Sequence, residues 1–290
     1  MAMSDCRSAR ARLTPFWIGL ALVAGLYLAF LVALIGSTAR FTTPRQIWEV
    51  LGTPEIRHSI FLSLTTCTVS ALFALLLAVP VGYLLSRARF TGKSLLDAAL
   101  DIPIVLPPIV VGLCLLIFFQ TRTGKFLDES IPDLMRATGL DVWLTRKQFP
   151  PHTDAFTYTV FGVVLAQFVI GAAFAVRTMR GVFDHLSSRP EDVAMTLGCS
   201  RGQAVWMVTL PAARRGMFAA FSIAWARGLG EFGPILVFAG ATRMKTEVLS
   251  TSVFLEFTVG RLEAAIAVSL LMIALALIVL VAVRLVGERL

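Results

Sequence analysis

Residues 191–211 read Glu-Asp-Val-Ala-Met-Thr-Leu-Gly-Cys-Ser-Arg-Gly-Gln-Ala-Val-Trp-Met-Val-Thr-Leu-Pro, and they separate two long apolar segments of the chain. The stretch itself is amphipathic and polar enough to lie in water. Gly198 can break it into two short helices, because glycine is unfavourable inside a helix and well suited to a helix end. The pattern predicts a compact projection from a membrane, a shape that a soluble partner can grip.

The ends of both short helices carry recognisable capping residues. The first helix can begin after Ser187 or Ser188, because serine side chains accept hydrogen bonds from free backbone N–H groups. Ser200 can cap the second helix, which is predicted to run up to Leu210-Pro211. This segment, residues 187–211, is the knob.

The composition places the knob in a membrane protein. The chain has 290 residues, of which 57% are hydrophobic and only 15% are charged, and its mean hydropathy is +0.80. Repeated apolar runs near the length that crosses a bilayer predict an all-α, multi-pass integral membrane fold. The net charge of +8 comes from basic residues at the ends of these runs. That distribution suits contact with membrane lipid headgroups and argues against nucleic-acid binding.

The residues that usually carry chemistry are sparse. Four cysteines and three histidines lie far apart in the sequence, so neither a disulfide framework nor a metal site is expected. The nucleotide-binding pattern Gly-x-x-x-x-Gly-Lys-Ser/Thr does not occur, and no nucleophile–base pair is visible. We therefore expect neither catalytic residues nor a bound cofactor, and the chain is not predicted to be an enzyme.

Six transmembrane helices are predicted, and they divide the chain into three parts. Residues 1–58 hold a cytoplasmic tail, the first helix and an external loop; residues 59–286 form the main domain; residues 287–290 form a second cytoplasmic tail. The helices are expected at about 15–36, 59–85, 95–119, 156–177, 213–240 and 264–286. Six crossings place both termini and the knob on one side, which the distribution of Lys and Arg supports weakly.

The long polar interval 121–155 is predicted to lie outside the membrane. Residues 126–131 and 134–144 can form short interfacial helices. The interval either shapes the docking surface of an external binding protein or is an insertion without a separate task.

The third predicted helix is rich in proline. Residues 101–112 read Asp-Ile-Pro-Ile-Val-Leu-Pro-Pro-Ile-Val-Val-Gly. Prolines free backbone carbonyls, which cannot be left unsatisfied in lipid, so this face should contact protein or a water-filled cavity. A kinked structural helix and a helix that lines a solute pathway are both compatible with the pattern.

The fifth predicted helix contains two charges in an apolar setting. Arg227 and Glu231 are four residues apart and therefore lie on one face of the helix. They can offset each other as an ion pair, or they can face the bundle interior and line a solute pathway. Pro234 breaks the hydrogen-bond ladder of its own helix, and the neighbouring glycines allow close approach of other helices.

The knob resembles a known motif. Glu191, Ala194, Gly198 and Leu210-Pro211 match the "EAA…G…LP" loop of bacterial ATP-binding-cassette (ABC) importer permeases, although Asp192-Val193 stands where the family often has alanines. In that family the loop, here within residues 181–211, docks into a groove on the cytoplasmic ATPase. The resemblance implies an ATPase-coupling role for Glu191, Ala194, Leu197, Gly198, Ser200, Leu210 and Pro211.

Two further stretches resemble the molybdate, tungstate and sulfate branch of these permeases. They are the Leu-Pro-Pro-Ile-Val-Val-Gly string 106–112 and Leu-Gly-Glu-Phe-Gly at 229–233. In that branch the two corresponding helices line the central pathway. The resemblance implies a pathway or gate role for Pro107, Pro108, Gly112, Arg227, Gly230, Glu231, Phe232, Gly233 and Pro234. Direct anion binding by Glu231 is not expected, because a carboxylate repels an anion.

The resemblance implies the transmembrane subunit of a type I ABC importer in the bacterial cytoplasmic membrane, with molybdate or tungstate as the favoured cargo. Its implied partners are an ATPase dimer that binds ATP and magnesium, a second permease copy and an external binding protein. A homodimer is favoured over a heterodimer. Sulfate, phosphate, an amino acid or a polyamine remain alternative cargoes. An ion-coupled secondary transporter is a remote alternative, because such proteins usually carry several intramembrane acids or histidines.

Overall fold

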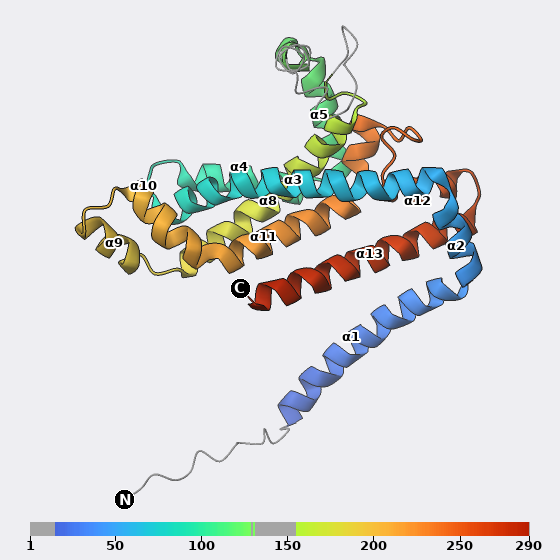
Figure 1. Ribbon diagram of the computed structural model, residues 1–290, viewed down its shortest axis with the longest axis horizontal. Helices are drawn as coiled ribbons and strands as arrows, with labels where there is room; N and C mark the ends of the chain where they lie inside the picture. Colours follow the sequence, from blue (N-terminus) through green and yellow to red (C-terminus); the bar gives the residue numbers. More distant parts are fainter. Residues whose placement is uncertain (1–14, 129, 131–154, 290) are drawn as a thin grey trace, which may run out of the picture.

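The computed structural model describes residues 15–128, 130 and 155–289, and every regular element among them is helical. Figure 1 shows an elongated helical bundle with two short helices projecting from one end. The all-α prediction is confirmed. The N-terminal tail before residue 15 and the predicted helix at 134–144 lie outside the described residues, and the predicted helix at 126–131 is described only in part.

The helices follow one another along the chain with short connections. The first five are α1 (Pro15–Arg40), α2 (Pro44–Gly52), α3 (Pro54–Arg87), α4 (Lys93–Val105) and α5 (Pro108–Gln120). After the long polar interval 121–155 come α8 (Val160–His185), α9 (Arg189–Thr196), α10 (Arg201–Ala204), the π-helical turn η1 (Val205–Thr209) and α11 (Leu210–Gly230). The chain ends with the π-helical turn η2 (Ile235–Ala239), α12 (Leu249–Thr258) and α13 (Leu262–Arg289).

Several of these helices can cross a membrane. In the described part of the chain, 4 helices are long and apolar enough, namely Trp17–Arg40, Pro54–Arg87, Val160–His185 and Leu262–Val281. The pair α4 and α5 makes a fifth if the two count as one span. The fifth predicted span, 213–240, coincides with α11 and η2, and α11 does not reach the same apolar composition because it carries Arg214, Arg215 and Arg227.

The third predicted span is not one helix. α4 and α5 meet at an angle of 110°. Leu106 between them is extended, with ψ of 141°, because a residue that precedes proline is pushed out of the helical region. Pro107 and Pro108 then lack the N–H groups that would continue the ladder. The proline string predicted a loosened helix, and the structure shows a sharp corner at that point.

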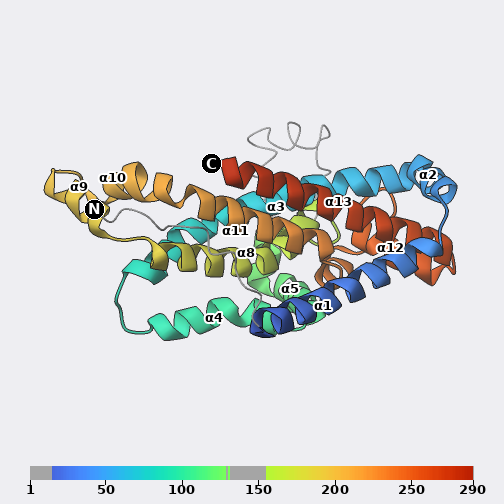
Figure 2. The same ribbon diagram turned by 90° about the horizontal axis from the view of Figure 1, so that it is seen from below.

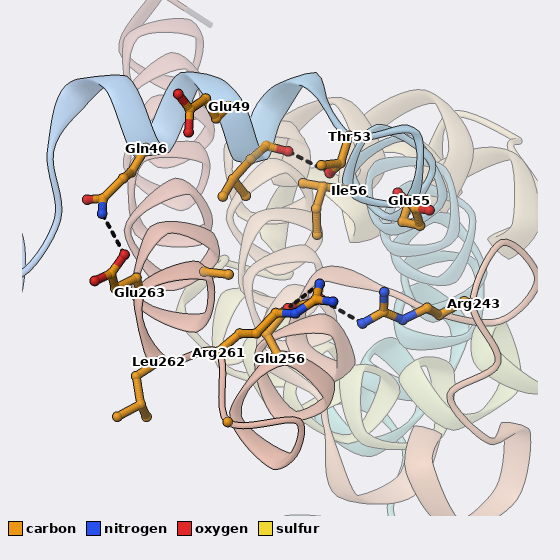
Figure 3. Close-up of a pocket in the computed structure, with 13 residues that line it drawn as sticks. Gln46, Glu49, Thr53, Glu55, Ile56, Arg243, Glu256, Arg261, Leu262 and Glu263 are labelled. Carbon is orange, nitrogen blue, oxygen red and sulfur yellow. Dashed lines mark hydrogen bonds and ion pairs between the residues drawn. The ribbon is translucent and has the colours of Figure 1, made fainter.

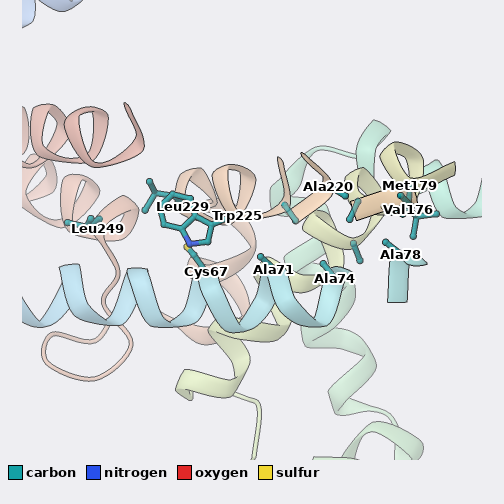
Figure 4. Packing of buried hydrophobic residues seen from close by; sticks show 14 of the residues in the cluster. Cys67, Ala71, Ala74, Ala78, Val176, Met179, Ala220, Trp225, Leu229 and Leu249 are labelled. Atoms are coloured by element: carbon teal, nitrogen blue, oxygen red, sulfur yellow. The ribbon is translucent and has the colours of Figure 1, made fainter. Parts of the chain in front are cut away.

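The core of the bundle lies between α3, α8 and α11, and small residues bring these helices close together. Ala71, Ala74 and Ala78 of α3 are fully buried in this core (Figure 4). A Cβ atom on Gly82 would lie 2.9 Å from the backbone nitrogen of Arg180 in α8. Close backbone approach replaces the hydrophobic driving force that helices lack in lipid. The hydroxyls of α3 also serve packing, as when Trp225 Nε1 donates to Thr68 Oγ1 at 3.2 Å.

Two ends of the bundle are distinct. α9 and α10 lie at one end, whereas α2, α12 and the start of α13 lie at the other (Figures 1 and 2). Asp128 connects the described residues on the two sides of the long polar interval. Its carboxylate accepts hydrogen bonds from Phe156 N at 2.7 Å and from Thr157 Oγ1 at 2.9 Å.

Candidate functional site

The first part of the site is the knob, which begins as the sequence predicts. Ser188 occupies the N-cap position of α9 without a side-chain cap bond, while Ser187 Oγ accepts from Arg189 N at 3.3 Å. Gly198 ends the helix with φ of 96°, in the left-handed region that favours glycine. Ser200 caps α10 through a reciprocal pair of hydrogen bonds with Gln203.

The sequence predicts that the second helix of the knob ends at Leu210-Pro211. In the structure this helix continues through η1 into α11. The π-helical turn η1 makes this possible, because Leu210 N donates to Val205 O, five residues back. Pro211 then occupies the first turn of α11, where a missing N–H is tolerated. The knob is therefore joined to α11 by an uninterrupted run of helical backbone.

The outer surface of the knob is apolar. Leu197 is 81% exposed, and Val193, Trp206 and Met207 are also exposed. Clustered large apolar side chains at the end of a water-accessible projection mark a surface for a protein partner. Gly198 and Ser200 are exposed beside them, and Ala194 and Leu210 are half-buried. The sequence analysis singled out Leu197 but missed Trp206 and Met207, which lie in η1.

Glu191 faces inward instead of joining this surface. Glu191 is only 6% exposed. Tyr83 Oη of α3 donates to Glu191 Oε1, and Thr209 Oγ1 donates to Glu191 Oε2 at 3.1 Å. The carboxylate therefore fastens α9 to α3 and to η1. Tyr83 and Thr209 were missed by sequence reasoning, because Tyr83 lies 108 residues from Glu191 along the chain.

The second part of the site is the break between α11 and η2, residues 231–234. Glu231 is extended, with ψ of 122°, so the helical ladder stops after Gly230. The carbonyl oxygens at the break remain paired. Gly228 O accepts from Glu231 N at 3.2 Å and from Gln167 Nε2 at 3.2 Å, and Glu231 O accepts from Ser250 Oγ at 2.6 Å. Backbone and side-chain donors together satisfy these two carbonyls, as a broken helix inside a membrane requires.

The two charges at the break form an ion pair, one of the two arrangements that their spacing allows. Arg227 Nη2 donates to Glu231 Oε1 at 2.8 Å. The side chains are unequally covered, since that of Glu231 is 4% exposed and that of Arg227 is 43% exposed. The guanidinium carbon also lies 4.9 Å from the ring centroid of Phe174. The pair therefore buries its negative member and presents its positive member outward.

The break packs directly against the start of α5. A Cβ atom on Gly112 would lie 2.7 Å from Pro234 Cα, and a Cβ atom on Gly233 would lie 3.0 Å from Ile109 N. Two glycines thus let two backbones touch. Pro107 and Pro108 are exposed at the corner before this contact. Phe232 turns to α12, where its ring centroid lies 5.1 Å from that of Phe254.

The opposite end of the molecule from the knob contains a cavity of about 760 Å³ (Figure 3). Glu256 lines it and holds two arginines: Arg243 Nη2 donates to Glu256 Oε1 at 2.6 Å, and Arg261 Nη1 lies 3.7 Å from Glu256 Oε2. Gln46 of α2 donates to Glu263 of α13 at 2.6 Å across the opening. Sequence reasoning missed this cavity, because its walls come from segments that are distant along the chain.

Glu247 lies buried at the same end, in the connection before α12. Its Oε1 atom accepts from Ser252 Oγ at 2.8 Å, and that hydroxyl lies 3.0 Å from Ser59 Oγ of α3. Burial raises the pKa of Glu247, with a further increase from the nearby carboxylates of Glu256 and Glu55. Its hydrogen bond with Ser252 and the charge of Arg243 act in the opposite direction.

This burial predicts a pH-dependent stability. The folded chain holds the Glu247 proton more tightly than the unfolded chain, so stability falls as pH rises above the ordinary carboxyl value of 4.5. We expect Glu247→Gln, which keeps an acceptor for Ser252, to raise the melting temperature at pH 7.5 by about 2–4 °C. Melting curves of the detergent-solubilised protein at pH 5 and pH 7.5 measure this. An equal change at both pH values would contradict the assignment.

The fold and this site define a class of protein. A bundle of membrane helices with an apolar knob at one end and a broken, glycine-lined helix contact inside it has the features of an importer's membrane subunit. Residues 74–290 match the family of binding-protein-dependent transport system inner membrane components, and the chain belongs to this family. It is therefore a multi-pass inner-membrane permease subunit of an ABC importer, as the knob motif predicted.

Individual relatives agree with this assignment. The sulfate transport system permease protein CysT of Escherichia coli strain K12 is 30% identical over 244 residues, which cover 84% of this chain and 81% of that protein. The molybdenum transport system permease protein ModB of Mycobacterium tuberculosis is 31% identical over 271 residues, or 93% of each chain. A bacterial ABC transporter involved in alginate import shares the fold, with a TM-score of 0.68 at 16% identity over 96% of this chain and 97% of that one.

Proposed function

We propose that this permease translocates a tetrahedral oxyanion, with molybdate or tungstate favoured and sulfate next. The observation that carries the proposal is the ion pair at the break, in which Glu231 is buried and Arg227 is 43% exposed on its side chain. A cation presented beside a broken helix attracts an anion without a dedicated binding pocket. The names of the sulfate and molybdenum permeases that resemble the chain support the same cargo class.

The driving force would come from a partner. An ATPase dimer that binds ATP and magnesium would grip the apolar surface of the knob around Leu197 and Trp206. Closure of that dimer would bring two knobs together, one from each copy of a permease homodimer. Because the knob continues into α11 through η1, the movement would reach the break and alter its contact with α5. Such two-state rigid-body movements are how a ligand shifts a transporter between inward-open and outward-open forms.

The sidedness follows from the knob. With the ATPase in the cytoplasm, the knob and both termini would be cytoplasmic, and the cavity at the other end would face outward. That end would receive the external binding protein, which selects the cargo. The cavity bordered by Arg243, Glu256 and Arg261 supports this placement, because a polar, charged recess suits a partner that docks and leaves.

The test measures uptake of radiolabelled molybdate, tungstate and sulfate in cells that hold the chain, its ATPase and its binding protein. Neutralising the pair with Arg227→Met and Glu231→Gln removes the exposed cation and leaves no unpaired buried carboxylate. We expect ATP-dependent uptake to fall about tenfold, a change that corresponds to about 1.4 kcal/mol. Arg227→Lys, which keeps the charge, is the matched control and should retain most uptake.

The outcomes separate the parts of the proposal. If the unmodified complex takes up none of the three anions, the cargo is not one of these oxyanions, although the assignment to the importer class still holds. Full uptake by the Arg227→Met, Glu231→Gln variant would show that the charge of Arg227 is not needed for uptake. Uptake that ignores ATP depletion would contradict an ATP-driven mechanism.

A further inference from the structure

α4 is attached to the bundle in an unusual way. Among the described residues of this helix none is buried, and its main neighbour is α8. Leu95, Ile102 and Val105 are exposed apolar residues on it. A helix with so little buried surface needs another device to stay in place against its neighbour.

Two ion pairs supply that device. Arg180 Nη1 of α8 donates to Asp97 Oδ1 of α4, and Arg177 Nη1 lies 3.6 Å from Asp101 Oδ2. Asp97 and Asp101 share one face of α4 because they are four residues apart, and the two arginines share one face of α8 because they are three apart. Opposite charges therefore meet at two successive positions where α4 lies against α8.

Asp184 gives Arg180 a second acceptor. It lies on α8 itself, with its Oδ2 atom 3.7 Å from Arg180 Nε. This third carboxylate has the same partner but does not connect the two helices, so it serves as an internal control for the two that do.

The crossing joins the two parts of the functional site. α8 ends at His185, and after residues 186–188 the chain enters α9 of the knob. α4 ends at Val105 and turns the corner into α5, whose first turns touch the break through Gly112. The ion pairs thus lie between the element that leads to the knob and the element that reaches the break.

We propose that Asp97, Asp101, Arg177 and Arg180 are positioning residues that make α4 and α8 move as one strut. The strut carries knob movement to the α5 side of the break, while the continuous helix through η1 carries it to the α11 side. None of the four residues contacts the cargo in this role. The inference rests on the proposed function only in assuming that a partner moves the knob.

Removal of the two α4 carboxylates should loosen the contact between α4 and α8 without unfolding the chain. Arg180 keeps Asp184 of its own helix as an acceptor, and most of the Arg177 side chain is exposed even when Asp101 is present. Neither arginine is therefore left buried without a partner. The effect of the removal should appear in coupling between the knob and the break.

The experiment uses the complete complex in proteoliposomes and measures oxyanion transported per ATP hydrolysed. Asp97→Asn with Asp101→Asn should lower this ratio at least threefold while the ATPase rate stays near its original value. Asp184→Asn should leave the ratio unchanged. Exchanging one pair, Asp101→Arg with Arg177→Asp, should restore at least half of the ratio lost when Asp101→Arg is made alone.

A second measurement does not depend on the cargo. Leu113→Cys on the exposed side of α5 is labelled with a maleimide, with and without ATP, in a chain whose Cys6, Cys114 and Cys199 are replaced by serine, which leaves the buried Cys67 as the remaining native cysteine. ATP should change the labelling rate in the parent chain and not in the doubly neutralised variant. The strut would be contradicted if the variant kept the original ratio of oxyanion transported to ATP hydrolysed, or if ATP still changed its labelling rate. It would also be contradicted if Asp184→Asn lowered the transport ratio as much as the double substitution does. Failure of the parent chain to transport oxyanions, with its ATP response intact, would overturn the cargo alone.

Discussion

Gly233→Val is expected to abolish uptake, and Gly112→Val is expected to do the same. A Cβ atom on Gly233 would lie 3.0 Å from Ile109 N and 3.2 Å from Ile109 Cα, and one on Gly112 would lie 2.7 Å from Pro234 Cα. These neighbours are backbone atoms, which cannot rotate away as a side chain can. Overpacking of this kind costs about 1–3 kcal/mol at each site even with relaxation, and here it separates the two elements that form the proposed gate.

The measurement is ATP-dependent uptake in cells that contain equal amounts of membrane-inserted protein. Gly25→Val in the membrane helix α1 is the matched control, because no described atom lies within 4 Å of a Cβ atom built on Gly25. That variant should keep at least half of the original uptake. If Gly25→Val and Gly233→Val are equally impaired, the defect follows from loss of a glycine in a membrane helix, and the close contact with α5 is not its cause.

Glu191→Ala is expected to lower uptake about a hundredfold. Glu191 accepts hydrogen bonds from Tyr83 and from Thr209. Hydrogen bonds to a charged group contribute about 1.5–3 kcal/mol each, and a factor of a hundred corresponds to about 2.8 kcal/mol. Loss of both bonds also leaves the half-buried hydroxyl of Tyr83 and the buried hydroxyl of Thr209 without this acceptor, so α9 is no longer fastened to α3.

Matched variants distinguish fastening from direct ATPase contact. Tyr83→Phe removes one of the two bonds from the membrane side, and we expect about a tenfold loss of uptake without any change on the surface of the knob. Asp192→Asn alters the neighbouring exposed carboxylate and should have little effect. Copurification of the ATPase with each variant is the second readout. Wild-type uptake by Tyr83→Phe, with Glu191→Ala still inactive, would show that Glu191 acts on another partner.

Much of this architecture follows from local sequence signals. Apolar runs of bilayer length predict α1, α3, α8 and α13, because lipid requires every backbone group in a span to be satisfied within it. The capping serine at 200 and the glycine at 198 define the knob for the same local reason. The prolines at 107 and 108 located a disruption, although the 110° corner that results depends on what α5 packs against.

Local sequence signals could not predict which residues contact each other between different helices. The sequence shows that Glu191 begins a helix but not that Tyr83 holds it, and it shows Arg227 and Glu231 on one face but not which of the two is covered. It also places Asp97 and Asp101 four residues apart, but not the two arginines of α8 that pair with them.

The division has a physical cause. Helix length, caps and breaks are set by bonds within a few residues, and the sequence by itself determined these for most of the chain. Burial, close backbone contacts and ion pairs between helices depend on which surfaces meet, and only the tertiary structure decided them. In this permease the local rules built the knob and the break, and long-range contacts through Glu191, Gly112, Gly233 and the α4–α8 crossing joined them.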